Sequence, residues 1–285
     1  MSLTQLHDIA APAKLNLFLH VTGRRADGYH LLQSVFMLID WCDTLHFDLR
    51  HDGQISREDL GPPLPADDLI VRAAQRLRQA SGTTFGAHIG ILKTIPAQAG
   101  MGGGSSDAAS TLLALNRLWG LNWPLSRLLP IGLSLGADVP FFLHGHHAWV
   151  EGIGEDIRPI TLPSAQFAVV KPATGLETAR IFGSPDLQRA TEPATMPDFA
   201  AAPFSFGRND LQPVARTLCP EIDQAIDWLH CFGLQARMTG SGSAVFAHLP
   251  QAVEFHSPPD GWQLKVCSNM AAHPLAGWAS SDDLR

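Results

Sequence analysis

Charged residues are scarce in this sequence of 285 residues: they make up 16% of it, against roughly 25% in an average soluble domain. Acidic side chains outnumber basic ones, 27 to 20, and the net charge is −7. No segment gathers basic residues into a run that could follow a phosphodiester backbone. The composition therefore argues against a nucleic acid partner. It still allows a small anionic ligand, for which a few backbone amides and one or two cations suffice.

Lysine, tyrosine and cysteine are also rare. Only four of the 20 cationic residues are lysines, and Tyr29 is the single tyrosine. The cysteines form neither a Cys-x-x-Cys pair nor a zinc pattern, which predicts free thiols and a cytoplasmic protein; they are Cys42, Cys219, Cys231 and Cys267. Every long apolar stretch is interrupted, and the N-terminal residues lack the basic segment and apolar core of a secretory signal. We therefore expect no membrane span and no export.

Apolar residues, by contrast, make up 45% of the sequence, which is enough for a folded chain with a large core. The length predicts one large domain or two medium-sized ones. Between residues 13 and 21 apolar residues occupy every second position, which is the period of a half-buried strand. This alternation places Lys14 and Asn16 together on the opposite face of that strand.

The same patterns predict further elements along the chain. Alternation indicates strands at 45–49 and 85–91, and Asp67 as an N-cap indicates a helix over 68–80. Helical spacing predicts further helices at 109–119, 126–135 and 220–231. Residues 184–205 are rich in Pro, Ala and Thr and indicate an exposed excursion, whereas 235–249 indicates two short strands around a Gly-Ser loop.

A glycine-rich loop occupies residues 96–107, between a predicted strand and a predicted helix. Its sequence, PAQAGMGGGSSD, ends in three glycines, two serines and an aspartate. Glycines let the backbone approach a ligand closely, and a helix N-terminus supplies free N–H groups, so the arrangement is typical of a phosphate site. The spacing matches neither a Walker A loop nor the Gly-x-Gly-x-x-Gly of dinucleotide-binding folds. A tight strand-to-helix connection is the alternative interpretation.

The loop resembles the phosphate loop of the GHMP kinases, the small-molecule kinases grouped with galactokinase, homoserine kinase, mevalonate kinase and phosphomevalonate kinase. Residues 96–106 follow that pattern with Met101 in place of Leu, 12–17 resemble the N-terminal motif, and 238–246 resemble the C-terminal glycine-rich motif. The resemblance implies an α+β fold of two domains with the active site in the cleft between them. The first domain, 1–158, would carry the phosphate loop, and 159–285 would form the C-terminal domain. ATP and Mg²⁺ are the implied cofactors.

Two further segments narrow this resemblance. GRRADGYH at 23–30 and GADVPFF at 136–142 are similar to the family members that phosphorylate the 2-hydroxyl of a cytidine diphosphate-linked methylerythritol in the non-mevalonate route to isoprenoids. The resemblance therefore implies an ATP-dependent kinase whose substrate is a small cytidine diphosphate-linked polyol. The alternatives are a homoserine or mevalonate kinase of the same family, or a catalytically silent member that binds nucleotide and regulates a partner. The presence of both Lys14 and Asp138 argues against the silent alternative.

The resemblance assigns a role to each motif residue. Asp138 would accept the hydroxyl proton, while Lys14 would orient Asp138 and offset charge on the phosphoryl group. The expected substrate-binding residues are Asn16 for the polyol, Tyr29, His30 and Phe182 for the cytosine, and Thr178. The expected ATP-binding residues are Asp68, Lys93, Pro96, Gly100, Met101, Gly102, Gly103, Gly104, Ser105 and Ser106. Thr239, Gly240, Ser241 and Gly242 are expected to line the cleft from the second domain.

Several residues leave room for other interpretations. Asp68 stands where relatives commonly carry Asn at the adenine or ribose end of the nucleotide. No second carboxylate motif identifies a magnesium ligand, so the ion is expected without assigned ligands. The histidines between His144 and His147 lack the spacing of a metal site and predict a turn before a strand. Taken alone, Asp138 also fits a turn cap, and Lys14 fits a solvated side chain.

Overall fold

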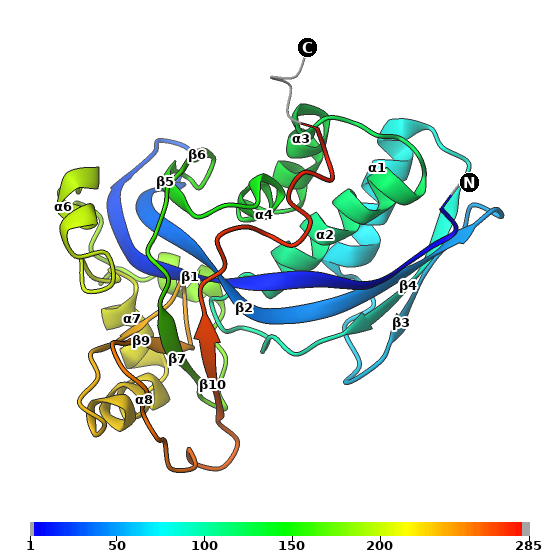
Figure 1. The fold of residues 1–285 in the computed structure, drawn as a ribbon. Coiled ribbons are helices and arrows are strands. Elements are labelled where there is room, and N and C mark those ends of the chain that lie inside the picture. The colour runs from blue at the N-terminus through cyan, green and yellow to red at the C-terminus, as the bar shows by residue number, and fades with distance from the viewer. Residues whose placement is uncertain (1–2, 281–285) are drawn as a thin grey trace.

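A long antiparallel hairpin runs through the first half of the fold (Figure 1). It consists of β1 (Gln5–Arg24) and β2 (His30–Arg50) in the computed structural model, which describes residues 3–280. The hairpin belongs to a six-stranded sheet in which β2 also pairs with β4 and β5, and β3 and β6 form the two ends. The other strands of this sheet are β3 (Ile55–Asp59), β4 (Gly86–Leu92), β5 (Ala148–Gly152) and β6 (Asp156–Pro159).

A second, four-stranded antiparallel sheet lies below the hairpin in Figure 1, in the order β10-β7-β9-β8. Its strands are β7 (Gln166–Lys171), β8 (Ala236–Met238), β9 (Val245–Leu249) and β10 (Gln263–Ser268). The chain passes from the first sheet to the second between residues 160 and 165. This change of sheet lies close to the proposed domain boundary after residue 158; residues 1–2 and 281–285 of the two proposed domains lie outside the described residues.

Four helices cover the upper face of the long strands in Figure 1: α1 (Leu69–Ser81), α2 (Gly103–Leu118), α3 (Leu125–Leu135) and α4 (Val139–His144). The remaining helices follow β7 along the chain: α5 (Thr178–Phe182), α6 (Met196–Ala201), α7 (Gln212–Leu218) and α8 (Glu221–His230).

The hairpin is buried from both sides, because each of its faces belongs to a different core. Ala11, Phe36 and Leu38 pack in the core that contains α1, α2 and α4. Leu15 and Leu17 pack with the second sheet in another core. Lys14 and Asn16 pair with Leu38 and Phe36 across the hairpin. The alternation along β1 thus directs Lys14 and Asn16 to the side where the glycine-rich loop lies.

The sequence patterns predicted about half of these elements and gave no signal for others, among them β3, β7 and β10. Two predictions were wrong. The N-cap of α1 is Asp68 rather than Asp67, because Asp68 has the extended backbone and its carboxylate accepts the N–H of Val71 at 2.8 Å. The expected excursion at 184–205 contains α6, whose first turn is capped by Thr195. The predicted strand at 13–21, the helix after the glycine-rich loop and the two short strands at 235–249 are confirmed.

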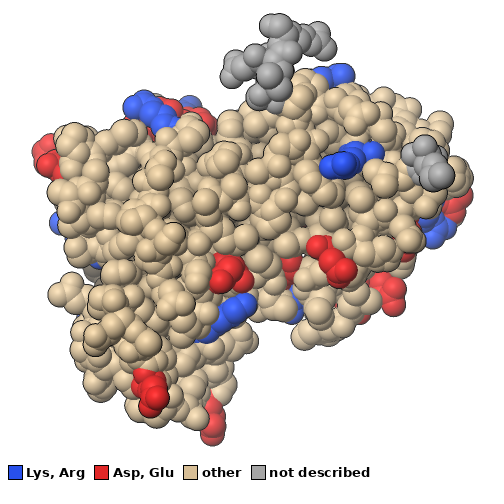
Figure 2. Space-filling model, in the orientation of Figure 1, with Lys and Arg blue, Asp and Glu red and all other residues tan. Residues whose placement is uncertain are grey.

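The surface in Figure 2 carries few charged side chains, as the composition predicts. No helix within residues 3–280 combines the length and apolar character that crossing a membrane requires. All four cysteines are free thiols, which confirms the prediction from their spacing.

Two histidines are buried without a charged partner. The Nδ1 of His147 accepts the N–H of Leu38 at 3.2 Å, and the Nδ1 of His273 accepts the N–H of Leu275 at 3.0 Å. Burial lowers the pKa of each of them from 6.5 to about 4. Between about pH 4 and 6.5 the folded chain keeps each ring neutral while the unfolded chain binds a proton. The free energy of unfolding is therefore highest above pH 6.5 and falls on acidification toward pH 4.

We therefore expect His147→Asn to be less stable than wild type at pH 7 and to lose less stability on acidification. Asn can keep the acceptor for Leu38 but has no proton to bind. The gap between the two proteins should shrink by about 1.4 kcal/mol per pH unit below pH 6.5. Denaturant unfolding at pH 7, 6 and 5 measures the gap, and a gap that stays constant would contradict the assignment.

Candidate active site

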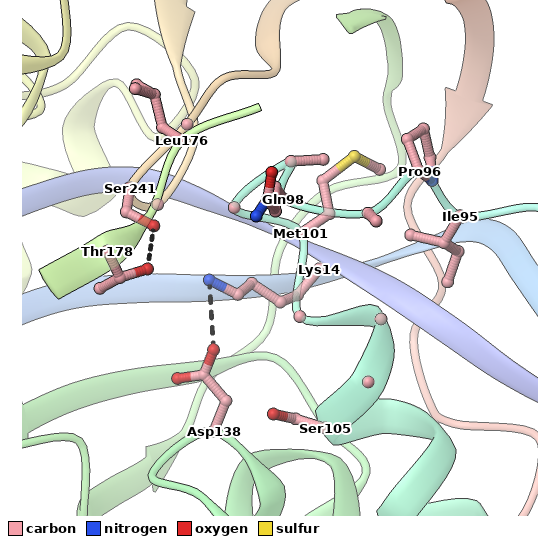
Figure 3. A pocket seen from close by; sticks show the side chains of 18 of the residues that line it. Lys14, Ile95, Pro96, Gln98, Met101, Ser105, Asp138, Leu176, Thr178 and Ser241 are labelled. Carbon is pink, nitrogen blue, oxygen red and sulfur yellow. Dashed lines mark hydrogen bonds and ion pairs between the residues drawn. The ribbon is translucent and has the colours of Figure 1, made fainter. Parts of the chain in front are cut away.

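An ion pair between a buried lysine and a partly exposed aspartate joins β1 to the start of α4. Lys14 Nζ lies 3.5 Å from Asp138 Oδ2, and the Lys14 side chain is only 5% exposed. Figure 3 shows Lys14 reaching from β1 toward Asp138, which sits at the N-terminus of α4 with its side chain unused by that helix. The Lys14 ammonium also lies over the Phe36 ring, 4.7 Å from its centroid. A lysine buried among apolar residues needs such partners, since an unpaired charge there would be costly.

Asn16 holds Lys14 in place from the same face of β1. Its Oδ1 accepts from Lys14 Nζ at 2.6 Å, and its Nδ2 donates to Ser34 Oγ at 2.9 Å. The Asn16 backbone N–H donates to the Thr239 hydroxyl at 2.9 Å. Asn16 is 1% exposed, so its amide positions the lysine while it also lines the cavity described below.

The glycine-rich loop places the N-terminus of α2 beside this pair. Gly102 is the N-cap of α2 and has a left-handed backbone, with φ +71°. The N–H of Lys14 donates to the Met101 carbonyl at 3.0 Å, which ties the loop to β1. The first turn of α2 has no side-chain cap, so its N–H groups are available to an anion. Ser105 lies on this turn and lines the same cavity.

A second glycine-rich loop, residues 239–242, closes directly onto the first. The N–H groups of Ser243 and Ala244 donate to the carbonyls of Gln98 and Ala99, at 3.1 and 3.3 Å. A side chain at Gly100 would come within 2.3 Å of the Thr239 carbonyl, so only glycine permits this contact. Backbone hydrogen bonds therefore join the two loops, which come from different halves of the fold.

The cavity between these loops has a volume of about 780 Å³, which is within the range of small-molecule sites. Most of the residues expected from the sequence line it: Lys14, Asn16, Asp68, Lys93, Pro96, Gly100, Met101, Gly102, Gly103, Gly104, Ser105, Asp138, Thr178, Phe182, Gly240, Ser241 and Gly242. On its far side Thr178 and Ser241 hydrogen-bond through their hydroxyls at 2.7 Å (Figure 3). The structure thus brings together residues from six separate segments of the chain.

The comparisons with known proteins agree with this geometry. The family described as "GHMP kinases N terminal domain" matches residues 68–146, and "GHMP kinases C terminal" matches residues 193–254. A protein of Albidiferax ferrireducens named 4-diphosphocytidyl-2-C-methyl-D-erythritol kinase is 67% identical over 98% of this chain and 97% of its own length. One of Paracidovorax citrulli with the same name is 66% identical over 98% of this chain and 99% of its own length.

The chain belongs to the 4-diphosphocytidyl-2-C-methyl-D-erythritol kinase family, whose fold is that of the GHMP kinases. A crystal structure of 4-(cytidine 5'-diphospho)-2C-methyl-D-erythritol kinase superposes with a TM-score of 0.75 and 30% identity, covering 93% of this chain and 98% of that one. A homoserine kinase from Cytophaga hutchinsonii shares the fold, with a TM-score of 0.67 at 15% identity over 96% of each chain. The α+β GHMP-kinase fold predicted from the sequence is confirmed.

Four of the expected site residues of this kinase family lie outside the cavity lining. Tyr29 is 61% exposed, and the ring of His30 lies against that of Phe182, with centroids 5.0 Å apart and planes tilted by 34°. Ser106 and Thr239 are fully buried. Thr239 instead receives the N–H of Asn16, whereas the Ser106 hydroxyl has no hydrogen-bond partner among the described residues.

Lys93 and Asp68 are engaged with protein partners rather than free. The Lys93 ammonium contacts the carboxylates of Asp43 and Asp107, the latter at 2.6 Å. Burial raises the pKa of Asp107 to about 7, although Lys93 opposes the shift, because two buried carboxylates share one cation. The Asp68 carboxylate caps α1 and pairs with Arg57. Contact of either residue with the nucleotide stays a prediction.

The sequence interpretation missed several residues that organise the site. Asp43 lies in the middle of β2, and its Oδ1 accepts the N–H groups of Thr94 and Ile95 at 2.6 and 2.8 Å, where the glycine-rich loop begins. Asp107 is the last residue of the glycine-rich segment, and its position directly after the two serines was the one sign in the sequence that it belongs to the site. Nothing in the local sequence of Asp43 or Ser34 indicates partners that lie about 50 or 18 residues away.

Gly102 offers a test of the loop with a matched control. A Cβ at Gly102 would lie 3.0 Å from the Phe142 ring and 3.3 Å from Lys14 Cε, whereas Gly82 has a similar φ of +68° and nothing within 4 Å. Alanine in a left-handed conformation costs roughly 1–2 kcal/mol at either position. Only Gly102→Ala should also displace Lys14. We expect a kcat loss of at least about tenfold in Gly102→Ala and none in Gly82→Ala, and equal kcat values in the two variants would refute the role of this contact.

Proposed function

We propose that this enzyme transfers the γ-phosphoryl group of ATP to the 2-hydroxyl of 4-diphosphocytidyl-2-C-methyl-D-erythritol, a step of the non-mevalonate route to isoprenoid precursors. The observation that carries the proposal is the Lys14–Asp138 pair, 3.5 Å apart, in a cavity that also contains the free N-terminus of α2. The high identity to kinases named for this substrate supports the choice among GHMP kinases.

Asp138 is proposed as the proton acceptor. As the substrate hydroxyl oxygen attacks the γ-phosphorus, the bond from that phosphorus to the ADP oxygen breaks and the hydroxyl proton passes to the Asp138 carboxylate. Asp138 suits this task because its side chain is 32% exposed toward the cavity and makes no helix-capping bond. Lys14 keeps the carboxylate oriented and lies where negative charge develops on the transferring group.

The phosphates of ATP are proposed to lie against the glycine-rich loop, where the N–H groups of the first turn of α2 point into the cavity. No group of three or more His, Cys, Asp or Glu side chains within residues 3–280 could hold a metal ion. A site with so few protein ligands suits Mg²⁺ that enters bound to the nucleotide, since that ion is commonly held by substrate phosphates and one or two protein ligands. The Ser105 hydroxyl would help to hold it, and the bound ion would neutralise phosphate charge.

The cytidine end of the substrate is proposed to bind beside the His30–Phe182 pair, with the neighbouring Tyr29 as a stacking surface. The Tyr29 side chain is exposed, and Phe182 both lines the cavity and packs against His30. Flat heterocycles bind well to such aromatic surfaces. Thr178, at the start of the helix that carries Phe182, supports this end of the site. A cytoplasmic location and the absence of nucleic acid and membrane partners belong to the same proposal.

A panel of alcohols tests the proposed reaction. ATP consumption should require the cytidine diphosphate-linked methylerythritol, and mevalonate or homoserine should not replace it. Phosphorus NMR of the product should show one new phosphate monoester beside an intact diphosphate bridge. Turnover of mevalonate or homoserine at a comparable rate would mean that the fold is correctly assigned and the substrate is not.

Replacing the proton acceptor should slow the chemical step. We expect Asp138→Asn to lower kcat by roughly 10²–10⁴-fold with little change in the Kd for ATP, because the phosphate cradle is intact. Asp198→Asn, the same change at an exposed position of α6, is the matched control and should keep wild-type kcat. An unchanged kcat in Asp138→Asn would exclude Asp138 as the base.

The Tyr29 ring should contribute to substrate binding by stacking. Base–aromatic stacking is worth about 1–3 kcal/mol, so Tyr29→Ala should raise KM for the cytidine substrate about 5- to 150-fold. Tyr29→Phe keeps the ring and should change KM little, and KM for ATP should stay constant in both variants. If both variants had the wild-type KM for the cytidine substrate, Tyr29 would not be a stacking surface.

A further inference from the structure

Arg189 holds the proposed cytidine site from behind. It follows α5 in the chain and is half-buried. Its two terminal amino groups donate to three backbone carbonyls, those of Phe182 at 3.2 Å, Ser184 at 2.6 Å and Leu187 at 3.0 Å. Its remaining donor, Nε, lies 3.0 Å from His30 Nε2. Arg189 thus contacts the His30 ring and the backbone of Phe182, whose rings pack against each other, and it forms no ion pair within residues 3–280.

The contact between Arg189 and His30 determines which nitrogen of the imidazole carries the proton. An arginine Nε always carries a hydrogen and can only donate, so His30 Nε2 must accept. The single proton of the neutral ring is then on Nδ1. A doubly protonated ring would direct an N–H at the guanidinium. Burial, and then the charges of Arg189 and Arg24, lower the pKa of His30, which agrees with a neutral ring.

We infer that Arg189 sets the base specificity of this kinase by fixing His30 as the Nδ1–H tautomer, so that the ring offers the base edge a donor and no acceptor. The inference rests on the proposed function, in which His30 lies at the cytosine. Cytosine shares its O2 acceptor with uracil but differs at N3, which in cytosine is an acceptor that the His30 donor would meet. In uracil N3 carries a hydrogen, which would oppose the His30 donor. A site with a fixed hydrogen-bond donor binds a base less tightly when that base leaves the donor without an acceptor, as uracil would at N3. Arg189 is therefore a positioning residue that discriminates cytidine from uridine without touching the base.

The experiment compares wild type with Arg189→Met, Arg189→Lys and Arg216→Met. The probes are CDP and UDP, titrated by calorimetry, and KM and kcat are measured with the full substrate. Arg189→Met removes every donor and keeps an apolar stem, whereas Arg189→Lys can still donate to His30 Nε2. Arg216→Met is the matched control, because that guanidinium pairs with Asp223 on α8 instead.

Wild type should bind CDP more tightly than UDP. In Arg189→Met the Kd for CDP and the KM for the cytidine substrate should rise roughly 3- to 10-fold, which corresponds to the loss of one hydrogen bond. The Kd for UDP, the kcat and the KM for ATP should stay within about twofold of wild type. Arg189→Lys should recover part of the preference, and Arg216→Met should resemble wild type. A structural defect alone would weaken CDP and UDP equally and would not respond to lysine.

Nitrogen-15 NMR of the His30 ring tests the tautomer directly, and it does so on wild type even if a variant fails to fold. Nδ1 should give a protonated, pyrrole-type shift and Nε2 an unprotonated one at pH 7. In Arg189→Met the Nε2–H form should appear and the pKa should rise toward 6.5. A protonated Nε2 in wild type, or an unchanged ratio of CDP to UDP affinity in Arg189→Met, would overturn the inference. If the tautomer is as stated but wild type shows no preference for CDP, the proposed cytidine site is wrong and the specificity role falls with it.

Discussion

The burial of one lysine constrains the rest of this active site. Lys14 sits in the middle of a strand that is covered on both faces, so its ammonium has to find partners inside the protein. Asn16, the face of Phe36 and Asp138 supply them from β1, β2 and α4. A buried cation that lost Asp138 would keep only neutral partners. Burying Lys14 therefore requires the ion pair with Asp138, whatever role the pair has in the reaction. The same pairing explains why the Asp138 carboxylate turns toward Lys14 and does not cap α4.

The same strand connects the two glycine-rich loops. The backbone of Lys14 holds Met101 of the first loop, and the backbone of Asn16 holds Thr239 of the second. Direct hydrogen bonds between the loops complete the junction. The proposed phosphate site is consequently built by the fold itself, and the conformational cost of arranging its N–H groups belongs to folding rather than to binding. Asp43, Lys93 and Asp107 reinforce the junction by tying the start of the loop to the N-terminal part of α2.

Local patterns in the sequence predicted the parts of this arrangement that depend on local physics. The alternation along β1 placed Lys14 and Asn16 on one face, and the glycine-rich segment predicted a loop that leads into a helix. The first half of β2 was missed because residues 31–39 are buried on both sides and do not alternate. The partners of Lys93 and the contact of Arg189 with His30 could not be predicted either, since they join positions that only the folded chain brings together. The resemblance to GHMP kinases supplied the roles of residues, which periodicity alone does not assign.

The central claim is that Lys14 and Asp138 act as one unit in phosphoryl transfer, and a double-mutant cycle tests it most directly. The kcat values of Lys14→Met, Asp138→Asn and the double variant would be measured at saturating ATP and substrate, with unfolding temperatures to establish that each protein is folded. If the pair is a unit, the double variant should be no slower than the slower single variant, within about threefold. A double variant whose kcat loss equals the product of the two single losses would show that the residues act independently and would contradict the account.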